Sequence, residues 1–291
     1  MVAEKRRIPV DNADELKSFS WTQGEKSSGE TVTEPVLIER RGAVQWIIIN
    51  REERRNALNA NVALGIQAGL DAAEADRSVR AVVLTGAGDK AFCAGGDLQL
   101  HADGTPFPID AAAPRHYVAA LFRRMDSCRL PIIARINGPA LAGGFGLMCA
   151  CDLVVAREDA KLGTTEVKVG IFPMMILPYL LRVVSYRRVM ELCITGELIS
   201  ARDAEVENIV NYAVPAAELD AKLDWLLARI TDKSPTGIRL GKQALSKIRE
   251  MSTDAALEYA QFMLANMSRT KDAREGMTAF NEKRSPNWTA E

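Results

Sequence analysis

The sequence lacks the features that mark several large classes of protein. Positive and negative side chains nearly cancel, at a net charge of −1, so we expect no binding of nucleic acid. No apolar run is long enough to span a bilayer, and Asp152 interrupts the longest candidate region. The N-terminal region has no hydrophobic signal segment and mixes basic with acidic side chains. We therefore expect a cytoplasmic protein without a membrane partner.

Cysteine and histidine are also scarce. The five cysteines are odd in number and lack framework spacing, which is typical of reduced thiols. Cys149 and Cys151 are too close together for a zinc knuckle and lie in an apolar stretch, so we interpret them as structural and expect no metal site. The only two histidines are His101 and His116, and lone histidines are more often surface or core residues than catalysts.

The sequence does contain an alternation of short apolar strands with amphipathic helices, which favours an α/β core. Strands are expected at residues 36–40, 43–49, 81–85, 132–136, 153–156 and 209–214, with a hairpin at residues 41–42. Helices are expected at residues 60–75, 115–127, 142–148, 185–194, 216–230, 235–248, 253–267 and 271–283. We divide the chain into a flexible N-terminal extension (1–33), an α/β core (34–200) and a helical region (201–291) that serves packing or oligomerisation.

Two glycine-rich turns stand out within this alternation. The first, at residues 92–98, contains Gly96 and is expected to open a short helix, and the second contains Gly143 and opens an apolar helix. Backbone N–H groups at helix starts point into clefts and stabilise a developing negative charge. The acidic Glu166 follows the second turn and one further strand. We therefore predict that residues 131–166 hold half of an oxyanion hole and the one acid/base residue.

Four segments carry a resemblance to a known family: residues 54–59 (RRNALN), 91–98 (AFCAGGDL), 136–144 (INGPALAGG) and 162–171 (LGTTEVKVGI), with a matching tail at 275–284. Their order and spacing resemble the crotonase, or enoyl-CoA hydratase/isomerase, family. The resemblance implies a spiral of ββα units with a helical C-terminal oligomerisation region, and a homotrimer or dimer of trimers. It also implies an acyl-CoA substrate, with coenzyme A as part of the substrate and no separate cofactor.

The same resemblance assigns roles to individual residues. Gly96 and Gly143 match the two backbone donors to the thioester oxygen, and Glu166 matches the main acid/base residue. One such donor is worth about 3–4 kcal/mol in the transition state. Positions matching contacts to coenzyme A or the acyl chain are Ala57, Leu58, Ala94, Gly146, Phe280 and Lys283. Gln99 stands where many members have a lysine near the phosphates, and Arg54 and Arg55 are candidate substitutes.

The sequence departs from the family where hydratases carry a second glutamate, because Gly146 occupies that position. Hydration is easiest to explain with two carboxylates gripping one water, whereas moving a double bond needs one base, so isomerisation is favoured slightly. Gly146 is also expected to leave empty volume beside the acyl chain. Candidates for a substitute second acid are His101, His116, Asp103 and Asp110. The alternatives are therefore an isomerase, a hydratase, and a catalytically weak acyl-CoA-binding scaffold.

Overall fold

The computed structural model describes residues 34–99 and 116–291. The predicted N-terminal extension (1–33) lies outside the described residues, as do His101, Asp103 and Asp110. The two described ranges contain every strand predicted from the sequence, and every predicted helix except the first residue of the one at 115–127.

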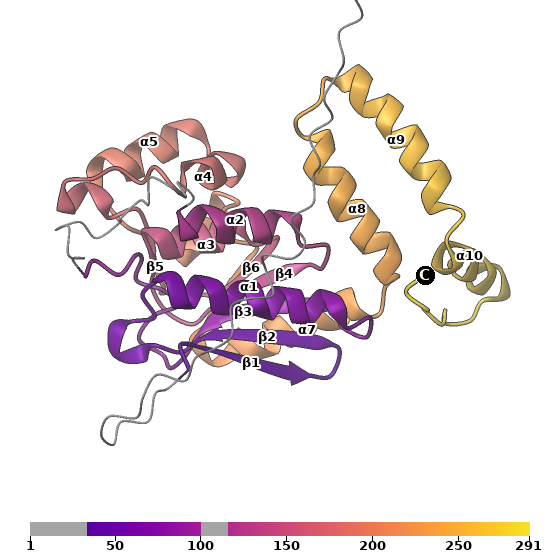
Figure 1. Cartoon of the computed structure of the whole chain (residues 1–291), viewed down its shortest axis with the longest axis horizontal. Helices are drawn as coiled ribbons and strands as arrows, with labels where there is room; N and C mark the ends of the chain where they lie inside the picture. The colour runs from indigo at the N-terminus through magenta and orange to yellow at the C-terminus, as the bar shows by residue number, and fades with distance from the viewer. Residues whose placement is uncertain (1–33, 100–115) are drawn as a thin grey trace, which may run out of the picture. The chain divides into compact units, whose positions relative to one another are not determined.

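A six-stranded sheet forms the centre of the fold, in the order β1-β2-β3-β4-β6-β9 (Figure 1). Its strands are β1 (Val36–Arg41), β2 (Val44–Ile49), β3 (Ala81–Gly86), β4 (Ile132–Ile136), β6 (Leu153–Arg157) and β9 (Tyr212–Val214). The predicted hairpin is confirmed, because β1 and β2 pair antiparallel across a turn in which Gly42 has a φ of 56°. The other neighbours pair parallel, as expected when helices connect successive strands.

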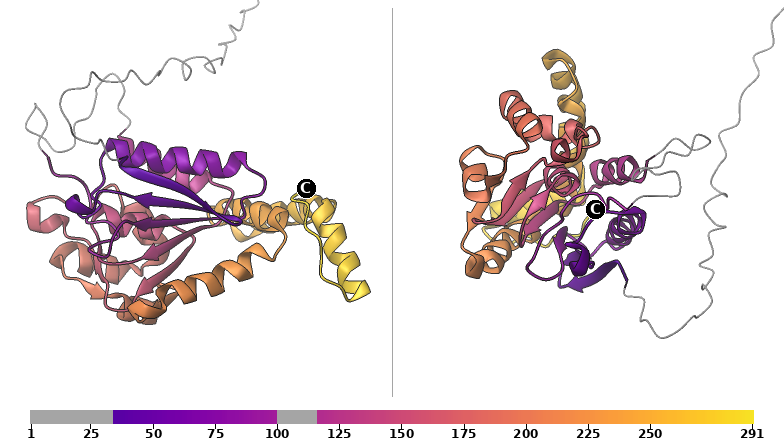
Figure 2. Two further views of the ribbon diagram at one scale, coloured as in Figure 1. Left: turned by 90° about the horizontal axis from the view of Figure 1, so that it is seen from below. Right: turned by 90° about the vertical axis from the view of Figure 1, so that its left-hand side faces the viewer.

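Helices cover both faces of this sheet. One face packs against α1 (Ala60–Ala75), α2 (Tyr117–Ser127) and α3 (Gly143–Ala150), and the other against α7 (Leu219–Thr231). Figure 2 shows the sheet between α1 and α7. Alternation along β2 explains this layering: Ile47 and Ile49 face the first cluster, while Val44 and Trp46 face the second. Each fully buried large apolar side chain contributes about 1.5–3 kcal/mol, so both layers stabilise the sheet.

A second, smaller sheet connects the functional turns. It consists of β5 (Ala140–Leu141), β7 (Lys161–Gly163) and β8 (Ile199–Ser200) in the order β5-β7-β8. These strands were not predicted, because two or three residues are too few to show a periodicity. The parallel pairing of β5 with β7 places Leu141 opposite Gly163, so the second glycine turn lies close to the segment that leads to Glu166.

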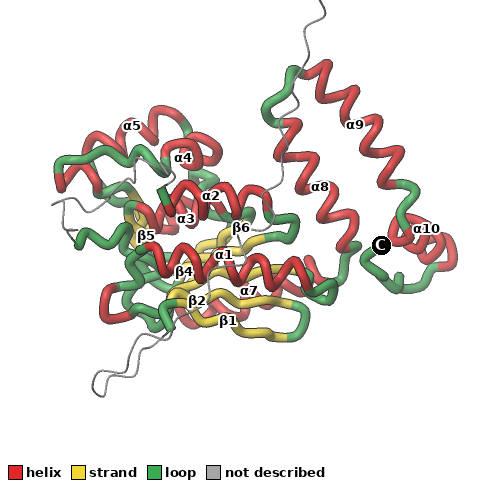
Figure 3. Tube along the Cα trace, viewed as in Figure 1, coloured by secondary structure: helices red, strands yellow, loops and turns green. Residues whose placement is uncertain are grey.

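The remaining elements are helical, as expected (Figure 3). The 3₁₀ turns are η2 (Glu52–Arg54), η3 (Glu166–Val169) and η4 (Ala216–Glu218). The helices are α4 (Leu177–Val183), α5 (Tyr186–Thr195), α6 (Ala201–Val206), α8 (Pro235–Ile248), α9 (Thr253–Met267) and α10 (Lys271–Glu282). No helix in the described ranges has the length and apolar character to cross a membrane.

Most predicted ends shift by a few residues, and three larger differences concern the core, β9 and the first glycine turn. The α/β core extends beyond residue 200, because β9 is the sixth strand of the main sheet and α7 packs on that sheet. The strand predicted from residue 209 begins only at Tyr212, since the Asn211 side chain accepts a hydrogen bond from the Val154 N–H and its own N–H bonds to the Val154 carbonyl. The short helix predicted after Gly96 is absent as far as Gln99, where the described segment ends.

Candidate active site

The first glycine turn is held by backbone hydrogen bonds to the loop before α1. The Leu58 N–H donates to the Gly95 carbonyl at 2.7 Å, and the Asp97 N–H donates to the Leu58 carbonyl at 2.7 Å. These bonds flank Gly96, so the N–H of Gly96 itself faces the opposite side of the strand. Gly95 has a φ of 106°, a conformation that only glycine adopts without strain.

Ion pairs reinforce the same turn. The Asp97 carboxylate accepts hydrogen bonds from Arg51 at 2.9 Å and Arg54 at 3.1 Å, and its side chain is only 9% exposed. Desolvation alone would raise the pKa of Asp97, but the bonds from the two arginines together lower it below the ordinary value. Asp97 is therefore ionised at neutral pH, and it ties the turn to η2.

A buried asparagine shapes the loop that meets this turn. Arg55 and Asn56 both have positive φ angles, of 50° and 56°. The Asn56 side chain is fully buried, donates to the carbonyls of Ala87 and Ala91 at 3.0 and 2.8 Å, and accepts from the Arg51 N–H at 3.0 Å. Asparagine tolerates the left-handed conformation better than most residues, which explains its presence at this position.

The second glycine turn is bonded both to the first turn and to the smaller sheet. The Leu141 N–H donates to the Cys93 carbonyl at 3.0 Å, and the Ala142 N–H donates to the Gly163 carbonyl at 2.9 Å. Ala142 has a φ of 50° and a ψ of −123°, which is unusual for a residue with a side chain. This sharp change of direction makes Gly143 the first residue of α3.

The two predicted donor amides are adjacent in space and unpaired. Neither the Gly96 N–H nor the Gly143 N–H has a hydrogen-bond acceptor within the described residues. A β-carbon built on Gly143 would lie 3.5 Å from the Gly96 nitrogen and 3.3 Å from Leu58 Cδ1. Glycine at 143 therefore keeps open the space in front of the Gly96 amide. An oxygen placed there would receive two backbone hydrogen bonds at the positive end of α3.

Glu166 lies on the segment that follows β7, the strand that pairs with β5 before the second glycine turn. It begins η3, three residues after the Gly163 carbonyl that binds Ala142. It is half-buried, and its Oε2 atom is fully covered without a hydrogen-bond partner among the described residues. Desolvation raises the pKa of Glu166, partly offset by backbone hydrogen bonds from Glu166 and Thr165. A carboxylate with weakened solvation and a free oxygen is suited to taking a proton and returning it.

The expectation of empty volume at Gly146 is wrong. Gly146 is buried, and a β-carbon built on it would lie 2.2 Å from Ile176 Cγ2 and 3.2 Å from Phe122 Cζ. Ile176 is only 2% exposed and belongs to the main core. The space beside the glycine is thus filled by an isoleucine that directly precedes α4. The sequence indicates that residues 174–177 are pocket wall or core, but nothing in it links Ile176 to Gly146, which is far away along the chain.

The residues assigned to coenzyme A fall into two groups. Ala57 and Leu58 are buried and Ala94 is half-buried, all within the hydrogen-bonded loops around Gly96. Phe280 and Lys283, by contrast, lie on and just after α10, which is far from β5 in Figure 1. The Phe280 side chain is 83% exposed. A single chain therefore does not bring these two residues to the glycine turns.

The candidate substitutes are of two kinds, one for the lysine near the coenzyme A phosphates and one for the second acid. Gln99 is exposed, and Arg54 pairs with Asp97, whereas Arg55 is exposed and makes no ion pair with a described residue. His116 caps the start of α2 by accepting from the Val118 N–H at 3.3 Å, and burial lowers its pKa. His116 is therefore mainly neutral at pH 7.

Comparisons with known proteins agree on one relationship. The family model described as Enoyl-CoA hydratase/isomerase matches residues 39–291. A Thermus thermophilus protein named "Putative enoyl-CoA hydratase" is 39% identical over 248 residues, covering 84% of this chain and 97% of its own. The Syntrophomonas wolfei "Crotonyl-CoA hydratase" is 32% identical over 262 residues, covering 88% and 98%.

Solved structures give the same result. The crystal structure of enoyl-CoA hydratase from Mycobacterium tuberculosis H37Rv matches with a TM-score of 0.80 and 32% identity, over 89% of this chain and 100% of that chain. The human enoyl coenzyme A hydratase domain-containing protein 3 matches with a TM-score of 0.81 and 25% identity, over 87% and 100%. The predicted crotonase-like fold is thereby confirmed.

Proposed function

The chain belongs to the enoyl-CoA hydratase/isomerase family, and we propose that it forms an enolate from an acyl-CoA thioester. The proposal rests most on one observation: the amides of Gly96 and Gly143 are unpaired among the described residues, and a β-carbon on Gly143 would lie 3.5 Å from the Gly96 nitrogen. A thioester oxygen gains negative charge when a proton leaves C2. Two fixed donors stabilise that charge without reorganisation, and each contributes about 3–4 kcal/mol.

We propose double-bond isomerisation as the reaction, with Glu166 as the main acid/base. Its carboxylate removes a proton from C2 of a 3-enoyl-CoA and returns it at C4, which places the double bond at C2. The free, desolvated Oε2 of Glu166 supports this role. Ile176 supports it as well, because it fills the space where a second carboxylate at position 146 would lie. Such a site has one proton carrier rather than a pair that grips water.

Hydration is the second candidate, and the names of the relatives favour it. Several are called enoyl-CoA hydratases, including those of Thermus thermophilus and Syntrophomonas wolfei. With Gly146 in place of an acid, hydration here requires Glu166 to work alone or with a residue that does not match the usual position. Among the candidates for a second acid, His116 lies within the described residues. It stands at the start of α2, and Phe122 of the same helix lies beside the Gly146 position.

The test is to supply wild-type protein with 3-enoyl-CoA and, separately, 2-enoyl-CoA of several chain lengths. The two isomers have the same mass, so they are separated by chromatography against authentic standards, and the hydrated product is identified by mass spectrometry. The proposal predicts that 3-enoyl-CoA becomes 2-enoyl-CoA faster than 2-enoyl-CoA gains water. Faster water addition would establish a hydratase instead. Tight binding of every substrate without turnover would leave an acyl-CoA-binding scaffold as the function.

We propose that coenzyme A enters as part of the substrate and that no separate cofactor takes part. Its contacts would come from Ala57, Leu58 and Ala94, which border the Gly96 turn. Arg55 is exposed on the same loop and carries a charge with no ion-pair partner among the described residues, so it is suited to a phosphate of coenzyme A. Arg55→Gln should raise the KM for acyl-CoA with little change in kcat, and an unchanged KM would refute this contact.

We also propose a homotrimer, or a dimer of trimers, built through the last helices. The helix α9 has no buried residue, although it carries Leu257, Phe262 and Leu264, each at least 60% exposed. Phe280 on α10 is similarly exposed. Apolar helix faces of this kind are usually covered by a partner. In that assembly Phe280 and Lys283 would close over coenzyme A bound to a neighbouring subunit.

Sedimentation analysis tests this assembly. The wild-type protein should sediment as a trimer or hexamer, and Phe262→Asp should dissociate it. A monomeric wild-type protein would contradict the proposal. Because Phe262 is 70% exposed in the single chain, its replacement should not unfold the subunit.

A further inference from the structure

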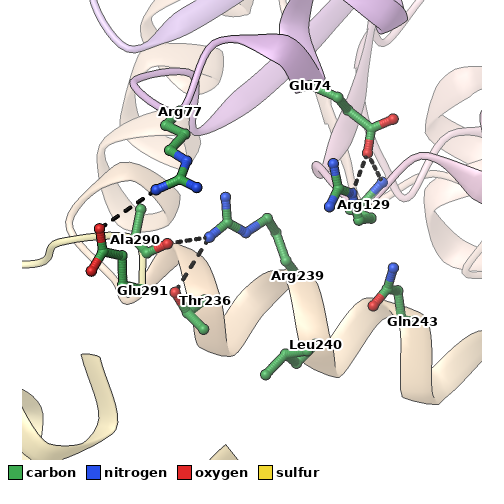
Figure 4. Close-up of a pocket in the computed structure, with 9 residues that line it drawn as sticks. All are labelled: Glu74, Arg77, Arg129, Thr236, Arg239, Leu240, Gln243, Ala290 and Glu291. Atoms are coloured by element: carbon green, nitrogen blue, oxygen red, sulfur yellow. Dashed lines mark hydrogen bonds and ion pairs between the residues drawn. The ribbon is translucent and has the colours of Figure 1, made fainter. Parts of the chain in front are cut away.

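A cavity of about 430 Å³ lies where α8 meets the C-terminal ends of α1 and α2. It is lined by Glu74, Arg77, Arg129, Thr236, Arg239, Leu240, Gln243, Ala290 and Glu291 (Figure 4). None of these residues belongs to the glycine turns. The loop at Leu58 precedes the start of α1, whereas Glu74 lies in its last turn, so a helix of about 24 Å separates the two sites.

Three arginine side chains from different elements meet in this cavity. Arg77 follows α1, Arg129 follows α2, and Arg239 lies on α8, with its guanidinium between the other two in Figure 4. The carboxylates nearby are already shared. Glu74 accepts from Arg129 at 2.9 Å and from Arg124 at 2.6 Å.

The Glu291 carboxylate is also shared between two basic side chains. It pairs with Lys271 and with Arg77, the latter at 3.5 Å. The two acids therefore have four basic partners between them, of which Arg124 also pairs with Asp71 at 2.6 Å. With Arg239 included, these basic groups still outnumber Glu74, Glu291 and Asp71.

Arg239 makes no ion pair within the described residues. It donates only to uncharged groups, Thr236 Oγ1 at 3.3 Å and the Ala290 carbonyl at 2.7 Å. Burial lowers its pKa first, and the neighbouring charges of Arg129, Arg80 and Arg77 lower it further, against a smaller opposing effect of Asp272. Arg239 is half-buried, so a bound anion would stabilise a guanidinium that its neighbours repel and that no carboxylate among the described residues pairs with.

We propose that this cavity binds a phosphoryl group, held by Arg239, Arg129 and Arg77. Guanidinium groups present paired N–H donors that match phosphate oxygens and retain their charge at all physiological pH values. The volume suits a phosphate or a small phosphorylated molecule. A bound anion would bridge α1, the loop after α2, and α8, so it would fix the angle at which the last helices leave the core. This inference does not depend on the proposed reaction.

Calorimetric titration in a phosphate-free buffer tests the site with two probes, inorganic phosphate and AMP. We expect saturable binding at one site per chain, weakened at least ten-fold by Arg239→Gln. Tighter binding of AMP than of phosphate would identify a nucleotide as the source of the phosphoryl group, and the reverse order would identify the free ion. Arg187→Gln is the matched control, because Arg187 is exposed and has no ion pair among the described residues.

Arg77→Gln keeps the test decisive if the Arg239 variant folds poorly. The Arg77 side chain is 77% exposed, so its replacement should leave the fold intact and weaken binding several-fold. The proposal is overturned if the wild-type protein shows no saturable binding of either probe. It is equally overturned if both variants bind as tightly as the Arg187→Gln control, since the anion would then occupy another place, such as the coenzyme A contacts.

Discussion

Replacing Gly143 with alanine should remove activity while leaving the fold intact. The added β-carbon would lie 3.5 Å from the Gly96 nitrogen, in the space reserved for the thioester oxygen. It would displace that oxygen from at least one donor. Loss of one such donor costs about 2.7–4 kcal/mol in the transition state, so kcat should fall about 10²–10³-fold.

The stability of the Gly143→Ala variant should change little. Gly143 is the first residue of α3 and does not have a positive φ, so alanine fits its backbone. The nearest atom to the new carbon is the flexible Leu58 Cδ1 at 3.3 Å. We expect the free energy of unfolding to change by less than about 1 kcal/mol.

The assay combines urea unfolding with steady-state kinetics on the active enoyl-CoA. Gly241→Ala is the matched control, because Gly241 lies on α8 and a β-carbon there meets no described atom within 4 Å. An active Gly143→Ala variant would refute the oxyanion reasoning. A variant that loses activity only because it unfolds would refute the claim that Gly143 serves the chemistry alone.

Three further predictions concern the surroundings of the two turns. Glu166→Gln should raise the melting temperature at pH 8 and not near pH 4. Because the pKa of Glu166 is raised in the folded state, the protonated carboxyl contributes stability at low pH, and that contribution is lost as pH rises through the folded-state pKa. Glutamine stays uncharged and so avoids that loss. Gly146→Ala should cost about 1–3 kcal/mol by overlapping Ile176, and combining it with Ile176→Ala should cost less than the sum of the single changes in urea unfolding. Asp97→Asn should cost about 1–3 kcal/mol by weakening its bond to Arg51, and should lower kcat by loosening the Gly96 turn; unchanged unfolding and kinetics would refute that role.

Long periodic segments made much of the fold predictable. The helices α1, α8 and α9 have the predicted bounds, because their apolar spacing and terminal residues are local signals. The smaller sheet was missed, because the pairing of Leu141 with Gly163 depends on tertiary contact rather than on local propensity. The same limit applies to β9, whose start is set by the bonds between Asn211 and Val154.

The candidate site was predictable in part for similar reasons. Gly96 and Gly143 were identified by their turns, and the structure places their amides side by side. The packing of Ile176 against Gly146 was not predictable, because no local pattern around either residue indicates that the two are in contact. The positive φ of Ala142 was equally hidden, since alanine rarely adopts that conformation. Motifs therefore located the donors, while packing decided what surrounds them.

In the proposed reaction, Glu166 alone carries the proton. The sharpest test is the rate at which Glu166→Gln converts 3-enoyl-CoA to 2-enoyl-CoA, with Glu218→Gln as a control at an exposed acid. We expect a kcat at least about 10²-fold below wild type for Glu166→Gln, with little change in KM and a wild-type rate for the control. A Glu166→Gln variant that retains the wild-type kcat would show that another group carries the proton.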